Sequence, residues 1–259
     1  MLIILSPAKS LNFETKIPAV KTTIPKFLND SKILADQLKK LSVLDLEKLM
    51  KISPKLAELN QQRFQDFGQE FNQKFDQQNN KPALFLFDGD VYKGMDIANY
   101  NGTDLEFAQN HLRILSGLYG ILKPLDLMQP YRLEMGINIK KILGKNLPQF
   151  WQEKIAGFLN DELLKQQEKT IINLASEEYF KAIDIDKING KIINIVFKEK
   201  KGDSHKIIGL FAKKARGLMA DFIIKNKIKK AEEIKKFTAK KYQFKTEFSD
   251  QLNWHFYQN

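Results

Sequence analysis

The chain has 259 residues, with 42 basic and 31 acidic side chains and a formal net charge of +11 at pH 7. Its 43% hydrophobic and 28% charged residues exclude a disordered chain and suit a folded protein with a sizeable core. It lacks cysteine, which excludes disulfides and thiol chemistry, and its three histidines (His111, His205 and His255) lack the spacing of metal ligands. We therefore expect neither a metal centre nor a cofactor.

The N-terminal segment gives no targeting signal. Residues 1–7 carry no basic region and too short an apolar run for a signal peptide. No stretch approaches the ~20 apolar residues that span a bilayer. Both observations favour a cytoplasmic protein with no membrane partner, and the sequence leaves the oligomeric state open.

Apolar runs bounded by turn residues predict the strands. We expect them, in chain order, at residues 2–5, 83–87, 112–115, 171–174, 191–197, 205–210 and, as the last strand, 238–244. Gly202-Asp203 is a turn signal and predicts a hairpin between the fifth and sixth of these strands.

Helical periodicity covers residues 31–75, 211–226 and a short charged stretch at 227–237, whereas residues 10–26 lack a pattern. Ser42 and Ser53 are candidate N-caps, and Pro54 suits a first helical turn. We expect a phenylalanine stripe to pack in the core: Phe64, Phe67, Phe71 and Phe75.

Strands and helices alternate irregularly, and no linker is long enough to separate domains. This order predicts a mixed α/β (α+β) fold. We expect a single domain over residues 1–259, in which helices flank a mixed sheet and residues 28–80 form a helical insertion.

Lysine outnumbers arginine 38 to four, a bias typical of low-GC coding sequence, so each arginine is informative. The guanidinium fork grips phosphate or carboxylate at two points and stacks on flat rings. Arg113, Arg132 and Arg216 lie in segments rich in Gly, Pro, Tyr or small residues, and we interpret them as candidate contacts to an anion or a base. Arg63 lies in a polar helix. The alternative for each is a structural ion pair.

Positive charge is concentrated in the last third of the chain. Residues 181–259 carry 19 basic and nine acidic side chains, against 23 and 22 in residues 1–180. Helical spacing puts Lys213, Arg216 and Gly217 on one small, basic face that a phosphate backbone would fit. A solvated lysine face is the alternative interpretation.

Residues 111–136 form the densest run of Gly, Pro and polar residues. Gly117 and Gly120 permit tight turns and a close approach of the backbone. Function concentrates on stiffened loops of this kind. The alternative is a structural crossover in which Arg132 pairs with Glu134, and the two interpretations are compatible.

Two further segments carry chemistry. Asp88, Asp90 and Asp96 follow the strand predicted at 83–87, and three carboxylates would suit magnesium, although acidic turns are common. Residues 45–60 indicate two helices joined by a very short turn, whose second helix presents free N–H groups to a phosphate between Lys51 and Lys55. An ordinary helical corner explains the same pattern.

Together these segments resemble the peroxide stress protein YaaA family. The matching stretches are Ser6-Pro7-Ala8-Lys9 and residues 82–96, 113–136, 173–179, 197–199 and 212–220. The resemblance implies a family-specific fold, a positively charged cleft and a DNA-binding helix-hairpin-helix element, which maps onto residues 44–64. It also implies protection of DNA against iron-driven damage during peroxide stress. Lys51-Ile52-Ser53 departs from the glycine that such a hairpin favours.

The first hypothesis is a DNA-binding protein that is not an enzyme. Duplex or distorted DNA would lie on the basic surface. The candidate nucleic-acid contacts are Lys9, Lys51, Lys55, Arg113, Arg132, Lys198, Lys213, Lys214 and Arg216.

The second hypothesis is an enzyme that acts on the N-glycosidic bond of a nucleobase or nucleoside. Polar groups on glycine-bearing loops would form its pocket: Ser6, Lys9, Asp88, Tyr92, Arg113, Ser116, Tyr119, Tyr131, Arg132 and Glu134. Asp126 or Glu134 would be its acid or base, with Tyr131 and Ser116 as further candidates, and no catalytic assignment is firm. A third hypothesis, iron sequestration, is disfavoured because the chain has so few histidines.

Overall fold

A computed structural model describes residues 1–68, 80–202 and 204–258. Its main strands are β1 (Leu2–Leu5), β5 (Leu112–Ser116), β6 (Gly120–Leu122), β8 (Thr170–Asn173), β9 (Lys191–Lys201), β10 (Ser204–Lys206), β11 (Tyr242–Phe244) and β12 (Asn253–Gln258). Within the described residues they form an eight-stranded sheet of order β11-β12-β9-β8-β1-β5-β6, with β10 paired to β9. The five strands from β12 to β5 are parallel, and β11, β6 and β10 run antiparallel to their neighbours. This sheet confirms the mixed α/β class.

Strand β1 lies inside the sheet, where it pairs with β5 on one side and β8 on the other. All four of its residues are fully buried. A continuous apolar run suits a parallel strand because both faces of such a strand are covered. The strand expected at residues 2–5 is therefore confirmed.

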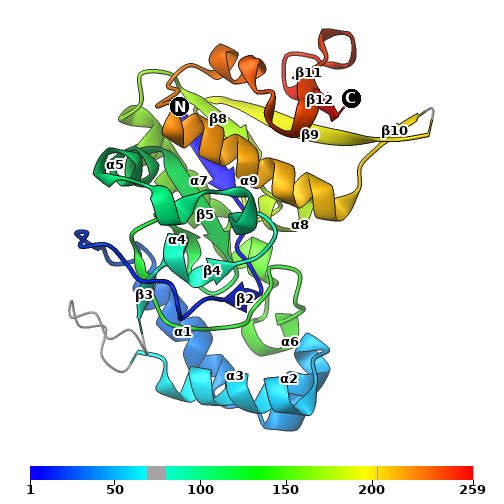
Figure 1. Cartoon of the computed structure of the whole chain (residues 1–259). Helices are drawn as coiled ribbons and strands as arrows, with labels where there is room; N and C mark the ends of the chain where they lie inside the picture. Colours follow the sequence, from blue (N-terminus) through cyan, green and yellow to red (C-terminus); the bar gives the residue numbers. More distant parts are fainter. Residues whose placement is uncertain (69–79, 203, 259) are drawn as a thin grey trace.

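Helices cover both faces of the sheet, as Figure 1 shows. Helix α9 (Gly209–Lys225) lies on the face of Phe197, since its Phe222 packs on Phe237, which in turn contacts Phe197. Helix α7 (Leu147–Leu164) lies on the other face, where its Glu162 meets Arg113 of β5. Residue alternation along the strands thus divides the side chains between two distinct layers.

The predicted helical insertion forms the lower part of Figure 1. It contains α1 (Leu28–Leu38), α2 (Val43–Met50) and α3 (Pro54–Asp66). Ser42 caps α2 through a reciprocal capping box with Asp45, and Ser53 is the N-cap of α3 without a side-chain bond. Of the phenylalanine stripe, Phe64 and Phe67 are buried, whereas Phe71 and Phe75 lie outside the described residues.

Short elements complete the fold. They are β2 (Ser10–Leu11) paired with β4 (Phe87–Asp88), β3 (Lys81–Pro82) paired with β7 (Leu127–Met128), and the helices α4 (Ala83–Leu86), α5 (Gly102–His111), α6 (Lys140–Leu143) and α8 (Glu177–Phe180). The 3-10 turns are η1 (Tyr92–Gly94), η2 (Ile97–Asn99), η3 (Ile185–Lys187), η4 (Ala231–Lys236), η5 (Ala239–Lys241) and η6 (Thr246–Phe248).

Three strand predictions need correction. Residues 83–86 are a buried helical turn, because a short apolar run looks the same in a buried helix and a buried strand. The strand expected at 205–210 ends at Lys206, where α9 soon begins. The strand expected at 238–244 covers only Tyr242–Phe244 and is not the last one, since β12 follows it.

Two glycines hold η1 against α9. A Cβ on Gly217 would lie 1.8 Å from the Val91 carbonyl oxygen, and a Cβ on Gly94 would lie 2.4 Å from that of Lys214. Both distances are impossible for real side chains, so the two backbones meet only because both residues are glycine. This contact fixes the position of η1, whose Tyr92 reaches the residue that follows β1.

Candidate functional site

The parallel strands β1, β5 and β8 end at the same edge of the sheet, and each is followed by polar residues. Ser6 follows β1, Ser116 ends β5, and Ser176 follows β8 by three residues. Ligands in α/β proteins commonly bind at the carboxyl ends of parallel strands. This edge of the sheet is therefore the first candidate for a binding site.

Hydroxyl groups join the segments at this edge. The Ser6 hydroxyl accepts a hydrogen bond from the Ser176 amide at 2.8 Å and donates to the Ser176 hydroxyl at 3.2 Å. The Tyr92 hydroxyl donates to the Ser6 carbonyl at 3.0 Å. These bonds fix the turn that begins at Ser6, so its conformation is set by two distant parts of the chain.

Ser116, at the end of β5, and Tyr131 form a second pair of hydroxyl groups at this edge. The hydroxyls of Ser116 and Tyr131 are 2.6 Å apart, and the Tyr119 amide donates to Ser116 at 2.9 Å. Burial raises the pKa of Tyr131, with a smaller contribution from the nearby Glu134 carboxylate, so its phenol stays neutral. Ser116 and Tyr131 therefore hold the loop rather than offer an activated nucleophile.

Glu134 also lies at this edge of the sheet, and one of its carboxylate oxygens forms ion pairs with two cationic side chains. Its Oε1 is 3.2 Å from Lys9 Nζ and 2.9 Å from an Arg132 guanidinium nitrogen. Its Oε2 is buried and has no hydrogen-bond partner within the described part of the chain. We call the shallow depression here the edge site; it is lined by Pro7, Ala8, Lys9, Tyr131, Arg132, Leu133, Glu134 and Tyr179.

The edge site holds one unused acceptor and one accessible cation. The Oε2 atom of Glu134 has the lone pairs to accept a hydrogen bond, and the side chain of Lys9 beside it is 65% exposed. The expected pair of Arg132 and Glu134 is confirmed. Sequence reasoning missed Ser176 and Tyr179 as site residues, although both lie in a polar run directly after a predicted strand.

Arg113 does not join Arg132 at the surface. It is completely buried and pairs with Glu162 of α7, and one guanidinium nitrogen also donates to the Gln109 carbonyl at 2.9 Å. Its assignment as a contact to an anion or base is therefore wrong in this structure: its alternative, the structural ion pair, holds.

Asp126 is also a structural residue. Its two oxygens accept hydrogen bonds from the Thr23 hydroxyl at 2.5 Å and the Lys123 amide at 2.7 Å. Burial raises the pKa of Asp126 to about 6 despite these bonds. It does not line the edge site, so Glu134 is the better-placed carboxylate of the two.

The carboxylates that follow the strand predicted at 83–87 are dispersed. Asp88 lies 4.0 Å from Lys93, while Asp96 pairs with Lys225 of α9 at 2.6 Å. Within residues 1–68, 80–202 and 204–258, no group of three or more His, Cys, Asp or Glu is placed to hold a metal ion.

On α9 the lysines and the small residue Gly217 differ in their exposure to solvent. Lys213 and Lys214 are exposed, whereas Gly217 packs inward on η1. Arg216 is half-buried, and among the described residues its side chain meets no partner; burial lowers its pKa. Lys198 lies on the opposite face of the sheet from α9, so it does not extend the same surface.

A short turn at residues 51–53 joins α2 to α3, in the segment onto which the resemblance maps a helix-hairpin-helix element. Lys51 ends α2 with φ 52° and ψ 54°, the left-handed conformation that usually favours glycine. The lysine thus adopts the geometry that its side chain disfavours, and the missing glycine does not prevent the turn. Lys51 and Lys55 are both exposed.

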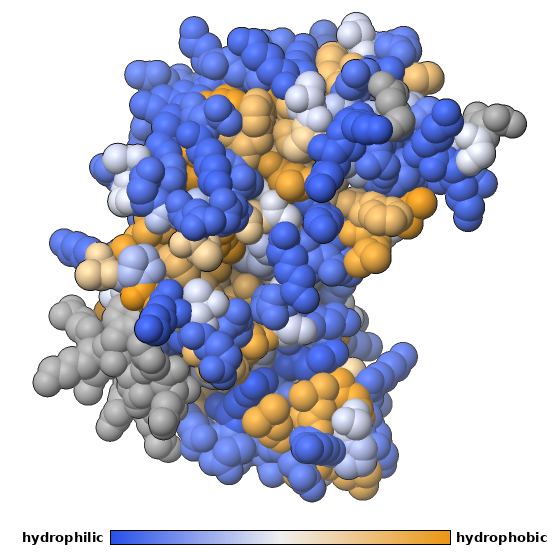
Figure 2. All heavy atoms as spheres, viewed as in Figure 1, coloured by the Kyte–Doolittle hydropathy of each residue, from blue (hydrophilic) through white to orange (hydrophobic). Residues whose placement is uncertain are grey.

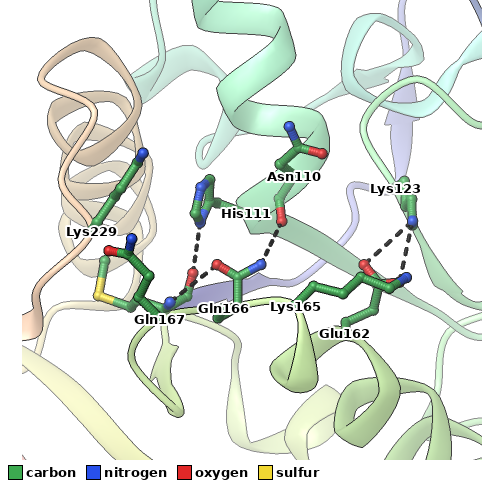
Figure 3. Close-up of a pocket in the computed structure, with 9 residues that line it drawn as sticks. Asn110, His111, Lys123, Glu162, Lys165, Gln166, Gln167 and Lys229 are labelled. Atoms are coloured by element: carbon green, nitrogen blue, oxygen red, sulfur yellow. Dashed lines mark hydrogen bonds and ion pairs between the residues drawn. The ribbon is translucent and has the colours of Figure 1, made fainter.

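A cavity of about 360 Å³ opens at the amino end of β1. In Figure 3, Lys123 and Lys165 both reach the Glu162 carboxylate, and Gln166 points toward Asn110. The ends of α5 and α7 meet here, and lysines at helix C-termini offset the negative ends of the helix dipoles. We interpret this cavity as structural.

Comparison with known proteins places the whole chain. The family model described as "Peroxide stress protein YaaA" matches residues 1–248. The chain belongs to that family. It is 50% identical over 250 residues to a UPF0246 protein of Saccharophagus degradans, covering 96% of each chain, and 48% identical to one of Acaryochloris marina over the full length of both. A UPF0246 protein of Aliivibrio fischeri is 50% identical over 94% of this chain and 93% of its own. The predicted resemblance is thus confirmed.

Across the described residues, no helix is both long and apolar enough to cross a bilayer.

Proposed function

We propose that the protein binds DNA through the basic surface of α9 and the α2–α3 hairpin, and so limits iron-driven damage during peroxide stress. The observation that carries this proposal is Arg216, a half-buried guanidinium without an ion pair in the described residues. Burying a cation without a partner is costly, and a phosphate would offset that cost.

Charge and shape support the same surface. Residues 181–259 carry a net charge of +10, and Lys213 and Lys214 precede Arg216 by one turn or less on α9. In Figure 2 the outline on the right is indented between the upper part, with α9, and the lower part, with α2 and α3. Lys51 and Lys55 lie in that lower part. Lysine and arginine side chains from α9 and from the α2–α3 hairpin would contact the phosphate backbone of the DNA rather than its base edges.

Binding is measured by fluorescence anisotropy of a labelled 25-base-pair duplex over a series of salt concentrations. We expect the logarithm of affinity to fall linearly with the logarithm of salt concentration. Lys213→Ala combined with Arg216→Ala should weaken binding several-fold and reduce the salt slope by about two.

The matched control is Lys21→Ala combined with Lys26→Ala. These two lysines are exposed and flank Thr23, whose amide donates to the Leu125 carbonyl, so they do not lie on α9. The double control variant therefore removes two positive charges, as the α9 variant does, but from another part of the surface. It should leave the affinity almost unchanged. Equal affinity of the α9 variant and the wild type, with both folded by circular dichroism, would refute the assignment.

A second candidate function is an enzyme that hydrolyses the N-glycosidic bond of a nucleobase or nucleoside at the edge site. The unpaired Oε2 of Glu134 favours it, because a carboxylate beside a depression lined by Tyr131 and Tyr179 could polarise water or a base N–H. Incubation with nucleosides and damaged duplexes, followed by chromatography for released base, tests it. Release should vanish in Glu134→Gln, and a lack of release from every substrate removes this candidate.

A further inference from the structure

The outer face of β9 and β12 carries a stack of rings. Phe248 lies parallel to Tyr257 of β12, with centroids 4.8 Å apart and planes 9° apart. His205 of β10 contacts the same tyrosine at 4.7 Å and 33°. Tyr257 is buried between its neighbours, but Phe248 is 53% exposed. The stack therefore ends in a phenylalanine that is open to solvent.

The open phenylalanine is held firmly. The Ser249 hydroxyl donates to the Lys245 carbonyl at 2.7 Å and accepts from the His255 amide at 2.9 Å. The Lys245 amide donates to the His255 carbonyl at 2.9 Å. These bonds fasten η6, which contains Phe248, to β12. A ring that is already positioned loses little conformational entropy when a ligand stacks on it.

Basic groups share this face of the sheet. Lys198 lies opposite Tyr257 in the strand register, donates to its hydroxyl at 3.0 Å, and lies 5.1 Å from its ring. Lys200 lies opposite His205 on the same side. The nearby carboxylates are Glu247 and Asp250, and Asp250 is already bonded to Asn253 and the Leu252 amide. The surface thus combines an open aromatic face with cations.

We propose that this surface, which we call the ring stack (Phe248, Tyr257 and His205, with Lys198 and Lys200), binds unpaired bases of single-stranded or distorted DNA. Aromatic faces in a basic groove are the usual means of gripping single strands, because every base has a flat face and every nucleotide carries a phosphate. A base stacks on Phe248, and Lys198 and Lys200 contact the adjoining phosphates.

The inference deepens the DNA-binding proposal and rests on it. The two surfaces lie on opposite faces of the sheet, since α9 covers the Phe197 face and Lys198 lies on the other. A duplex hides its bases in the stack, so it would use α9 and the hairpin alone. A gap, bulge or frayed end would use the ring stack as well, and this predicts a preference for damaged DNA.

The test uses a 15-nucleotide single strand with a central 2-aminopurine, whose fluorescence is quenched when it stacks. Wild-type protein should quench the signal, and Phe248→Ala should abolish the quench and weaken single-strand affinity about fivefold to 150-fold. Phe248→Trp should retain both. Phe13→Ala, which removes another exposed phenylalanine, is the matched control and should bind like the wild type.

The outcomes separate this inference from the proposed function. Phe248→Ala should bind an intact duplex as the wild type does, whereas Lys213→Ala with Arg216→Ala should lose duplex affinity. If Phe248→Ala quenched the fluorescence and bound the single strand as well as the wild type does, the ring-stack proposal would be overturned, and the duplex-binding proposal would stand. Absence of binding to any DNA, single-stranded or duplex, would overturn both proposals together.

Discussion

Replacing Glu162 with glutamine tests most directly whether the buried ion pair between Arg113 and Glu162 stabilises the fold. Arg113 is completely buried, and the side chain of Glu162 is only 5% exposed. The change keeps the shape of the side chain but leaves a buried guanidinium without its counter-charge. Breaking a buried pair in this way costs about 3–5 kcal/mol, a large part of the roughly 5–15 kcal/mol that stabilises a typical domain.

The pKa of Glu162 points in the same direction. Burial alone would raise this pKa, but the bonds from Lys165 and Arg113 outweigh it and lower the pKa from 4.5 to about 2. The folded state therefore favours the charged form of Glu162, and we expect Glu162→Gln to cost about 3 kcal/mol, the lower end of the range for a broken buried pair.

The assay is equilibrium unfolding in urea, followed by circular dichroism, with the slope compared between variants. Lys165→Ala is the control, because Lys165 contacts the same carboxylate from a 64% exposed position and should contribute less than about 1 kcal/mol. Arg113→Met combined with Glu162→Leu should recover most of the loss. A cost below about 1 kcal/mol for Glu162→Gln, at an unchanged slope, would refute the buried-pair argument.

Three further predictions concern stability. The advantage of the wild type over Glu162→Gln is complete above pH 4.5, the usual pKa, and should shrink as pH falls toward 2, as acid titrations of both proteins would measure. Gly217→Ala should lower the melting temperature by several degrees because its Cβ would meet the Val91 carbonyl, whereas Gly157→Ala, with open space around it, should be neutral or stabilising by up to ~1 kcal/mol. Lys51→Gly should stabilise by up to ~1 kcal/mol in urea unfolding by relieving its left-handed backbone; a loss instead would contradict that strain.

Local patterns predict the elements whose own residues carry a strong signal. The buried strand Leu2–Leu5 is a pure apolar run, and Ser42 and Ser53 both begin helices as their type suggests. Helix α7 was missed, although Asn146 and Pro148 mark its start, and β12 was missed although Asn253–Gln258 alternates polar and apolar residues. Both signals were present in the sequence.

The candidate site was harder to predict because it depends on contacts between distant segments. The partner of Arg113 lies 49 residues further along the chain, so burial of this arginine was not visible in its neighbours. Arg132 and Glu134 are two residues apart, and their pairing was foreseen. Phe248 carried no signal, since only the tertiary fold brings it beside Tyr257 and His205.

An amide chain crosses three of the parallel strands. Asn173 of β8 donates to Asn194 of β9 at 2.9 Å, and Asn194 donates to Asn253 of β12 at 3.1 Å. A slip of one residue in any of these strands would turn an asparagine toward the hydrophobic layer and strand its amide there. These three side chains therefore penalise a one-residue slip when the C-terminal strand β12 pairs with β9.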